Sequence, residues 1–301
     1  MKNIRPHLYL FIVNLFYGAG FTVSKAVMPE YIGPFAFILI RVTVTAVLFT
    51  MLQKIWLRET VHHRHVPLLI ACSLFGVVLN QELFFLGLSM TTPINASLIM
   101  IMTPILVFVI SFLMGYEKSV WFKWVGLLAG LAGALMIMGG SRLQVSDDTL
   151  AGDLCIFLNA TSYAVYLVIV RPLMQTYHPL TVIRWVFLLG CVPVTLFGWK
   201  ELISVNWHMF TPAVWAAVVF VVICITFLAY LLNIMALREV NASVVGAYIY
   251  LQPALATIIA VAAGKDNLTL HKLLAGMLIF AGVFLVSFSH KIKKQQMTTD
   301  V

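Results

Sequence analysis

The chain has 301 residues, of which 62% are hydrophobic and only 10% are charged, and its mean hydropathy is +1.00. A soluble domain of this size cannot bury so much apolar surface, so the composition excludes a water-soluble enzyme or binding module. The net charge of +8 does not indicate nucleic-acid binding, because basic loops attracted to anionic lipid explain it in a membrane protein.

Apolar runs of about 20 residues, long enough to cross a bilayer core of about 30 Å, recur along the whole chain. The first run continues to about Met28 without a small-residue cleavage site, which favours a retained helix over a cleaved signal peptide. We therefore predict an all-α integral membrane protein with ten transmembrane helices. The predicted ranges are 8–28, 34–56, 67–89, 94–115, 121–139, 152–172, 179–199, 211–234, 241–263 and 270–290.

The first predicted helix carries polar side chains on one stripe, and the sixth and ninth helices repeat this pattern. Polar stripes on membrane helices avoid lipid and face protein or water. A single polar residue is explained equally well by an interhelical hydrogen bond worth about 0.6 kcal/mol. Three stripes together favour a shared substrate cavity. Its predicted lining residues are Asn14, Tyr17, Lys25, Asn159, Tyr163, Tyr166, Tyr248 and Gln252.

The second and third predicted helices each carry a charge inside the span, Arg41 and Glu82. Both lie about 10 Å below the same boundary, at 1.5 Å per residue. Opposite charges at one depth offset each other's desolvation, so we predict that Glu82 pairs with Arg41, or with Lys25 if the first helix is nearer. A proton-coupling or substrate role for Glu82 stays open beside this pairing. Asn80, on another face of the same helix, is a candidate for packing or for the cavity.

Pro104 and Pro253 lie near the centres of the fourth and ninth predicted helices. Each removes one backbone hydrogen bond and bends its helix, so both are candidate hinges, with a static kink as the alternative. The fifth predicted helix contains GLLAG at 126–130, a GxxxG pattern that lets helices approach closely. We expect it to pack against the tenth helix or across a homodimer interface.

No pattern in the sequence predicts a catalytic residue, a metal site or a cofactor. The four cysteines fall singly in four apolar runs, as buried small side chains do. His62, His63 and His65 lie in a basic loop that has no second group of metal ligands. The sequence also lacks HExxH, GxSxG and P-loop motifs.

The distribution of Lys and Arg predicts the orientation. With the N-terminus in the cytoplasm, thirteen of these residues lie on or just inside the inner side, five lie outside, and Arg41 lies within a span. We therefore expect a multi-pass protein of a bacterial inner membrane with both termini cytoplasmic.

The two halves of the chain resemble each other. Asn14 and Pro34 match Asn159 and Pro179 at one spacing, and NAS recurs at 95–97 and 241–243. Each half holds five predicted helices, and an odd number gives the halves opposite orientations in the membrane. We predict two inverted five-helix repeats at 1–140 and 151–290, followed by a basic cytoplasmic tail at 291–301.

The stretches NLFYGAGFTVSK, GPFAFILIR, IMTPILV, GYEK and GLLAGLAGALMIM, with their order and spacing, resemble the EamA-like branch of the drug/metabolite transporter superfamily. The resemblance covers nearly the whole chain. It implies a ten-helix fold, export or exchange of small metabolites, and a supporting role for the fifth and tenth helices.

These observations predict a secondary transporter, expected to be an exporter, that works by alternating access of the two repeats. Aromatic and amide side chains suit an amino-acid-like or nucleobase-like solute, and energy would come from a proton gradient or from substrate gradients. The alternatives are a membrane-embedded enzyme acting on a lipid-linked substrate, which is not expected here, and a non-transporting scaffold. The oligomeric state stays open between monomer and homodimer.

Overall fold

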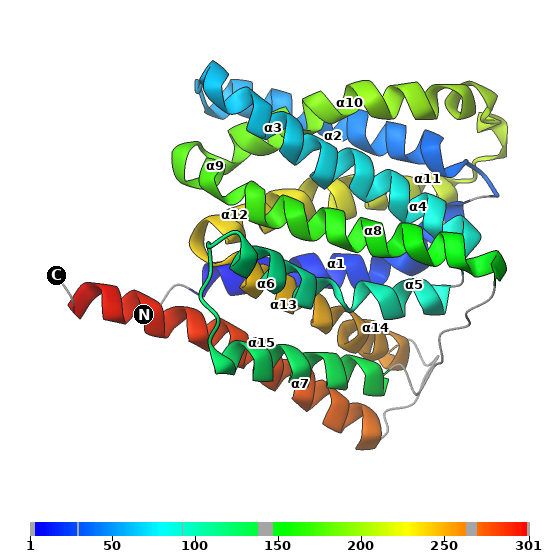
Figure 1. The fold of residues 1–301 in the computed structure, drawn as a ribbon. Coiled ribbons are helices and arrows are strands. Elements are labelled where there is room, and N and C mark those ends of the chain that lie inside the picture. The colour runs from blue at the N-terminus through cyan, green and yellow to red at the C-terminus, as the bar shows by residue number, and fades with distance from the viewer. Residues whose placement is uncertain (1–3, 29, 92, 138–146, 263–269, 300–301) are drawn as a thin grey trace.

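The computed structural model describes residues 4–28, 30–91, 93–137, 147–262 and 270–299, and every regular element in these ranges is helical (Figure 1). The elements form ten rods, where a rod is one helix or a run of consecutive helices that lie end to end. The first five are α1 (Arg5–Val27), α2 (Pro34–Trp56), η1–α3–η2–α4 (His63–His65, Val66–Ser73, Leu74–Val78, Leu79–Met90), α5–α6 (Pro93–Met100, Thr103–Leu113) and α7 (Trp121–Ile137).

The second half repeats this order. Its rods are α8–α9 (Asp147–Ile169, Arg171–Thr176), α10 (Pro179–Ser204), α11–η4–α12 (Pro212–Phe220, Val221–Leu228, Ala229–Glu239), α13–η5–α14 (Ala242–Ala247, Tyr248–Tyr250, Leu251–Ala262) and α15 (Leu270–Thr299). A short 3-10 helix, η3 (Trp207–Met209), precedes α11.

Ten predicted helices correspond to these ten rods, but several ends differ. α10 continues to Ser204 and α12 to Glu239, each about five residues beyond the predicted end. The backbone of α15 continues to Thr299, through most of the predicted basic tail. Hydropathy ends a segment at its last apolar residue, whereas a helix continues wherever polar residues keep the backbone hydrogen bonds.

Membrane embedding follows from length and composition. Among the described residues, six helical stretches are long and apolar enough to span a bilayer. They are Pro34–Trp56, His63–Met90, Leu150–Thr176, Pro179–Ser204, Pro212–Glu239 and Leu270–Phe288. Shorter apolar helices cover Leu98–Leu113, Trp121–Ile137 and Ala242–Leu255.

α7 and α15 pack along each other at one edge of the bundle (Figure 1). Glycines allow the close approach: a Cβ added at Gly126 would lie 2.8 Å from the carbonyl oxygen of Gly282. A Cβ at Gly133 would lie 2.6 Å from the carbonyl oxygen of Ala275. The GLLAG segment therefore faces the tenth rod, which is the first of the two packing partners that the sequence allowed.

The rods are interrupted at corresponding places in the two halves. The third and eighth rods both contain a π-helical stretch, η2 and η4. The fourth and ninth rods break just before Pro104 and Pro253, which lie in the first turns of α6 and α14. Prolines fit the first turn of a helix, where no intrahelical partner for the missing N–H exists. The sequence signalled the proline breaks but carried no signal for the π-helical stretches.

Candidate functional site

A cavity of about 150 Å³ lies in the middle of the bundle, between helices of both halves. In this measure a water needs about 10–15 Å³, so the space holds on the order of ten waters or a small metabolite. No described residue of α7 or α15 contributes to its wall. The lining residues are Val13, Asn14, Tyr17, Gly20, Ser24, Arg41, Asn80, Gln81, Phe84, Phe85, Leu88, Met100, Asn159, Tyr163, Ile225, Tyr230, Asn233, Val245, Ile249 and Gln252.

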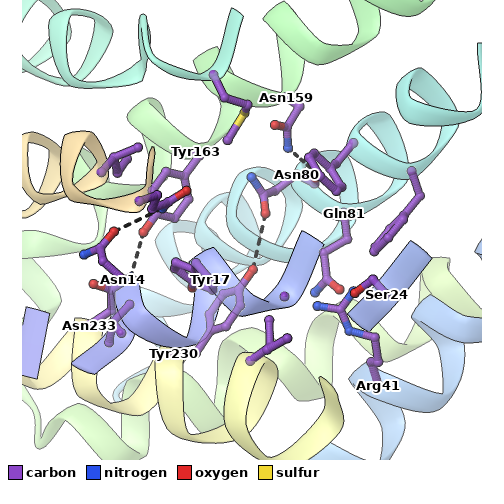
Figure 2. Close-up of a pocket in the computed structure, with 18 of the residues that line it drawn as sticks. Asn14, Tyr17, Ser24, Arg41, Asn80, Gln81, Asn159, Tyr163, Tyr230 and Asn233 are labelled. Carbon is purple, nitrogen blue, oxygen red and sulfur yellow. Dashed lines mark hydrogen bonds between the residues drawn. The ribbon is translucent and has the colours of Figure 1, made fainter. Parts of the chain in front are cut away.

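Hydrogen bonds between the halves hold the polar part of this wall in place (Figure 2). Gln252 donates to Asn14 Oδ1 at 3.0 Å, joining α14 to α1. Tyr230 of α12 donates to Asn80 Oδ1 at 3.3 Å, and Asn159 of α8 donates to the Asn80 carbonyl oxygen. Asn80 therefore contacts two helices of the second half, which fixes the position of α4 beside the cavity.

Within the second half, Asn233 donates to the Tyr163 hydroxyl at 2.8 Å, which links α12 to α8. Both side chains are less than a tenth exposed. Buried amides and hydroxyls with partners are fixed in position, so the cavity wall is largely pre-formed.

The structure contradicts the predicted pairing of Arg41 with Glu82. Arg41 Nε instead donates to Thr226 Oγ1 of η4 at 3.0 Å, and the guanidinium lies 5.7 and 5.2 Å from the ring centres of Phe37 and Phe85. Among the described residues, the one ion pair joins Lys123 to Glu117. Equal depth does not bring two side chains together when they leave their helices in different directions, which is the case here.

Glu82 lies outside the cavity wall. Both carboxylate oxygens are buried and have no hydrogen-bond partner within the described part of the chain. An ionised carboxylate without a partner is costly inside a protein, so this position favours the neutral acid.

The structure brings together Asn14, Tyr17, Arg41, Asn80, Asn159, Tyr163 and Gln252 around one cavity. Two other predicted lining residues lie elsewhere. The ring of Tyr166 is buried against Gly76, where an added Cβ would lie 2.4 Å from it. Tyr248 bonds His7 Nδ1 at 2.8 Å, away from the cavity wall. Lys25 belongs to α1, but its side chain lies outside the described residues.

Sequence reasoning missed several lining residues, above all Gln81, Tyr230 and Asn233. Gln81 follows Asn80 directly and points about 100° away from it around the helix, so a polar stripe through Asn80 does not include Gln81. Tyr230 and Asn233 form a polar pair at i, i+3 in an otherwise apolar span, and this spacing was the available signal.

Each copy of the NAS motif is bound by an acid from the other half of the chain. At the start of α5, Asn95 donates to the two carboxylate oxygens of Asp153 at 3.1 and 3.0 Å. At the start of α13, the Ser243 backbone N–H donates to Glu117 at 3.2 Å, and the Ser243 hydroxyl also donates to this carboxylate. The first motif lies at the junction of α4 and α5, and the second lies at the junction of α12 and α13. These two junctions lie at opposite ends of the bundle (Figure 1).

Glu117 lies in the connection between α6 and α7, outside the spans, and also pairs with Lys123. Burial alone would raise the pKa of Glu117, but Lys123 and the hydrogen bonds from Ser243 hold this pKa below its ordinary value. The carboxylate is therefore ionised at neutral pH.

The described residues contain no group of three His, Cys, Asp or Glu side chains that could hold a metal ion. The histidine loop contacts the second half of the chain instead: His65 Nδ1 lies 2.7 Å from the Tyr177 hydroxyl, which also accepts a hydrogen bond from the backbone N–H of His62.

The sequence profile of the EamA-like transporter family matches residues 4–139 and 150–288. The uncharacterized transporter YyaM of Bacillus subtilis is 23% identical over 98% of this chain and 97% of its own length. An uncharacterized transporter of Archaeoglobus fulgidus is 26% identical over 95% of this chain and 98% of its own length. A crystal structure with a TM-score of 0.78, at 18% identity, covers 96% of this chain and 99% of the other, so the fold is shared.

Proposed function

Because the chain belongs to the EamA-like transporter family, we propose that it exports a small amino-acid-like or nucleobase-like metabolite across the bacterial inner membrane. The observation that carries this proposal is the cavity between the halves, lined by amide and tyrosine side chains and one arginine. Its size suits a solute of about ten non-hydrogen atoms. The direction rests on the resemblance to the drug/metabolite transporters, and the distribution of Lys and Arg supports an orientation with both termini in the cytoplasm.

Alternating access is the mechanism that we propose. The two acid-bound NAS motifs are the candidate gates, Asn95 with Asp153 at the predicted outer end and Ser243 with Glu117 at the predicted inner end. Opening one gate while the other stays closed would expose the cavity to one side at a time. The breaks before Pro104 and Pro253 are candidate hinges for this motion.

Protons are the coupling ion that we propose, and Glu82 is the candidate carrier. The sequence lacks a P-loop, so no ATP-binding motif points to another energy source. A buried carboxyl without a hydrogen-bond partner binds and releases a proton when its surroundings change. Its distance from the cavity wall would make coupling indirect, through movement of α4.

The relatives are named as transporters and the family is a transporter family, so the membrane-enzyme alternative is not retained. A scaffold without transport remains the competing function. Metabolite profiles of cells with and without the protein would first identify a candidate solute. Uptake of that solute into proteoliposomes, with and without a pH gradient, then tests transport and coupling. Failure of every accumulated solute to move would support the scaffold.

A further inference from the structure

Arg41 stands in the cavity wall without a counter-charge. It is 6% exposed, and no described carboxylate forms an ion pair with it. Among the lining residues that the structure describes, it is the one charged side chain. A guanidinium inside a membrane protein is expensive to bury unpaired, and such residues mark substrate paths.

The guanidinium is held so that one edge stays free. Nε donates to Thr226, which is fully buried and itself donates to the Val221 carbonyl oxygen at 3.0 Å. The guanidinium carbon lies over the rings of Phe37 and Phe85, which restrict the group further. The two terminal nitrogens have no hydrogen-bond partner among the described residues. This is the edge with which arginine binds a carboxylate through two parallel hydrogen bonds.

Gln81 provides an independent observation. Its side chain is 3% exposed and lines the cavity, yet neither its Nε2 nor its Oε1 has a hydrogen-bond partner in the described part of the chain. In Figure 2 its amide points toward Arg41 and Ser24, which line the same cavity. A buried amide left without partners costs free energy that a bound polar group would recover.

We propose that Arg41 and Gln81 form a carboxylate subsite, so that the transported metabolite is a monocarboxylate or an amino acid rather than a nucleobase. This inference rests on the proposed transport function. The terminal nitrogens of Arg41 bind the two carboxylate oxygens, and Gln81 Nε2 donates to one of them. One guanidinium balances one negative charge, and the described wall offers no second cation for a phosphate dianion. Phe84, Phe85 and Leu88 receive the apolar part of the solute.

A binding experiment tests the subsite without requiring transport. The purified protein in lipid nanodiscs is titrated with matched pairs that differ in the carboxylate: benzoate and benzamide, L-phenylalanine and L-phenylalaninamide, L-leucine and L-leucinamide. Uracil and phenyl phosphate complete the panel. We expect at least one acid to raise the thermal midpoint while its amide does not. Arg41→Gln should weaken binding of that acid at least tenfold, and Arg41→Lys by less.

Two variants serve as controls. Arg184→Gln removes an arginine of α10 that bonds Gln53 outside the cavity, and acid binding should stay unchanged. Thr226→Val removes the acceptor of Nε and should weaken binding by less than Arg41→Gln does. Equal binding of acid and amide, unchanged binding in Arg41→Gln, or stronger binding of phenyl phosphate than of every carboxylate would overturn the proposal.

Gln81→Glu decides the question if no probe in the panel binds. This substitution places a carboxylate from the chain itself beside Arg41. In the wild-type background Gln81→Glu should therefore raise the thermal midpoint of the protein. In the Arg41→Gln background Gln81→Glu should lower the thermal midpoint. A lower midpoint in both backgrounds refutes the subsite. A stabilised Gln81→Glu variant combined with a wild-type protein that moves no solute would refute the proposed transport and leave the anion site standing.

Discussion

Glu117 and Ser243, 126 positions apart, join the two halves of the bundle: the carboxylate accepts both the backbone and the side-chain hydrogen bonds of this serine. Lys123 pairs with the same carboxylate, and all three residues are nearly fully buried. A buried carboxylate with several donors is stable only while it is ionised and while each donor stays in place. This contact therefore couples the packing of α13 to the charge of one residue.

Acid should remove the stabilisation that Glu117 provides. Its pKa in the folded protein lies below the ordinary value of 4.5, so the contribution is fully present above that value and decreases as the pH falls through the folded pKa. At pH 7, Glu117→Gln should cost about 3 kcal/mol or more by leaving Lys123 buried without a partner. Thermal midpoints of both proteins, measured from pH 7 to pH 3, should converge below pH 4.5. A constant difference across this range would contradict the assignment.

The two candidate gates should respond in opposite directions. A cysteine placed at Ser24 of the cavity wall, in a variant without native cysteines, reports access from outside through an impermeant maleimide. Asp153→Asn weakens the predicted outer gate and should increase the labelling rate, whereas Glu117→Gln weakens the predicted inner gate and should decrease it. A change of the same sign in both variants would refute the assignment of gates.

Gly76 should tolerate no side chain. A Cβ at this position would lie 2.4 Å from the ring of Tyr166, which is fixed in the core. Gly76→Ala should therefore cost about 1–3 kcal/mol through overpacking. Gly276 of α15 is the matched control, since no described atom beyond its own stretch of helix lies within 4 Å of its added Cβ. Thermal unfolding should show a lowered midpoint for Gly76→Ala and a near-neutral effect for Gly276→Ala.

Glu82→Gln tests the coupling role. The amide keeps the size of the side chain but cannot bind and release a proton. Solute exchange should therefore persist while the response to a pH gradient disappears. Counterflow and gradient-driven uptake in proteoliposomes separate these two activities. Retention of the pH response in Glu82→Gln would assign the coupling to another group, or to substrate gradients alone.

Pro104→Ala and Pro253→Ala test the hinges. If the breaks absorb the motion, alanine allows a more continuous helix, and the transport rate should fall severalfold while solute affinity changes little. If the breaks are static, both quantities stay near their wild-type values. Rate and affinity measured on the same preparation distinguish the two outcomes.

The helical architecture could be predicted from the sequence because hydropathy depends on composition alone. Runs of apolar residues identified ten rods, and recurring Asn, Pro and NAS positions indicated the two halves. Side-chain periodicity also predicted that Asn14, Tyr17 and Asn159 face a common cavity, and all three line the cavity of the structure, since a straight helix repeats every 3.6 residues.

Periodicity failed where the helix was irregular or where a partner lay on a distant rod. The π-helical stretches η2 and η4 change the direction in which the following side chains leave the helix. Thr226 lies in η4, where it accepts the hydrogen bond from Arg41. Tyr166 and Tyr248 follow the predicted stripes but lie against Gly76 and His7 instead of in the cavity.

The sequence by itself determined that lipid is the solvent, how many rods cross it and which rods carry polar faces, because these depend on the chemistry of consecutive residues. Only the tertiary structure decided which charges meet. Arg41 faces Thr226 and the cavity, whereas Glu82 lies outside the cavity wall, because packing angles between rods, rather than depth along them, set the distance between side chains.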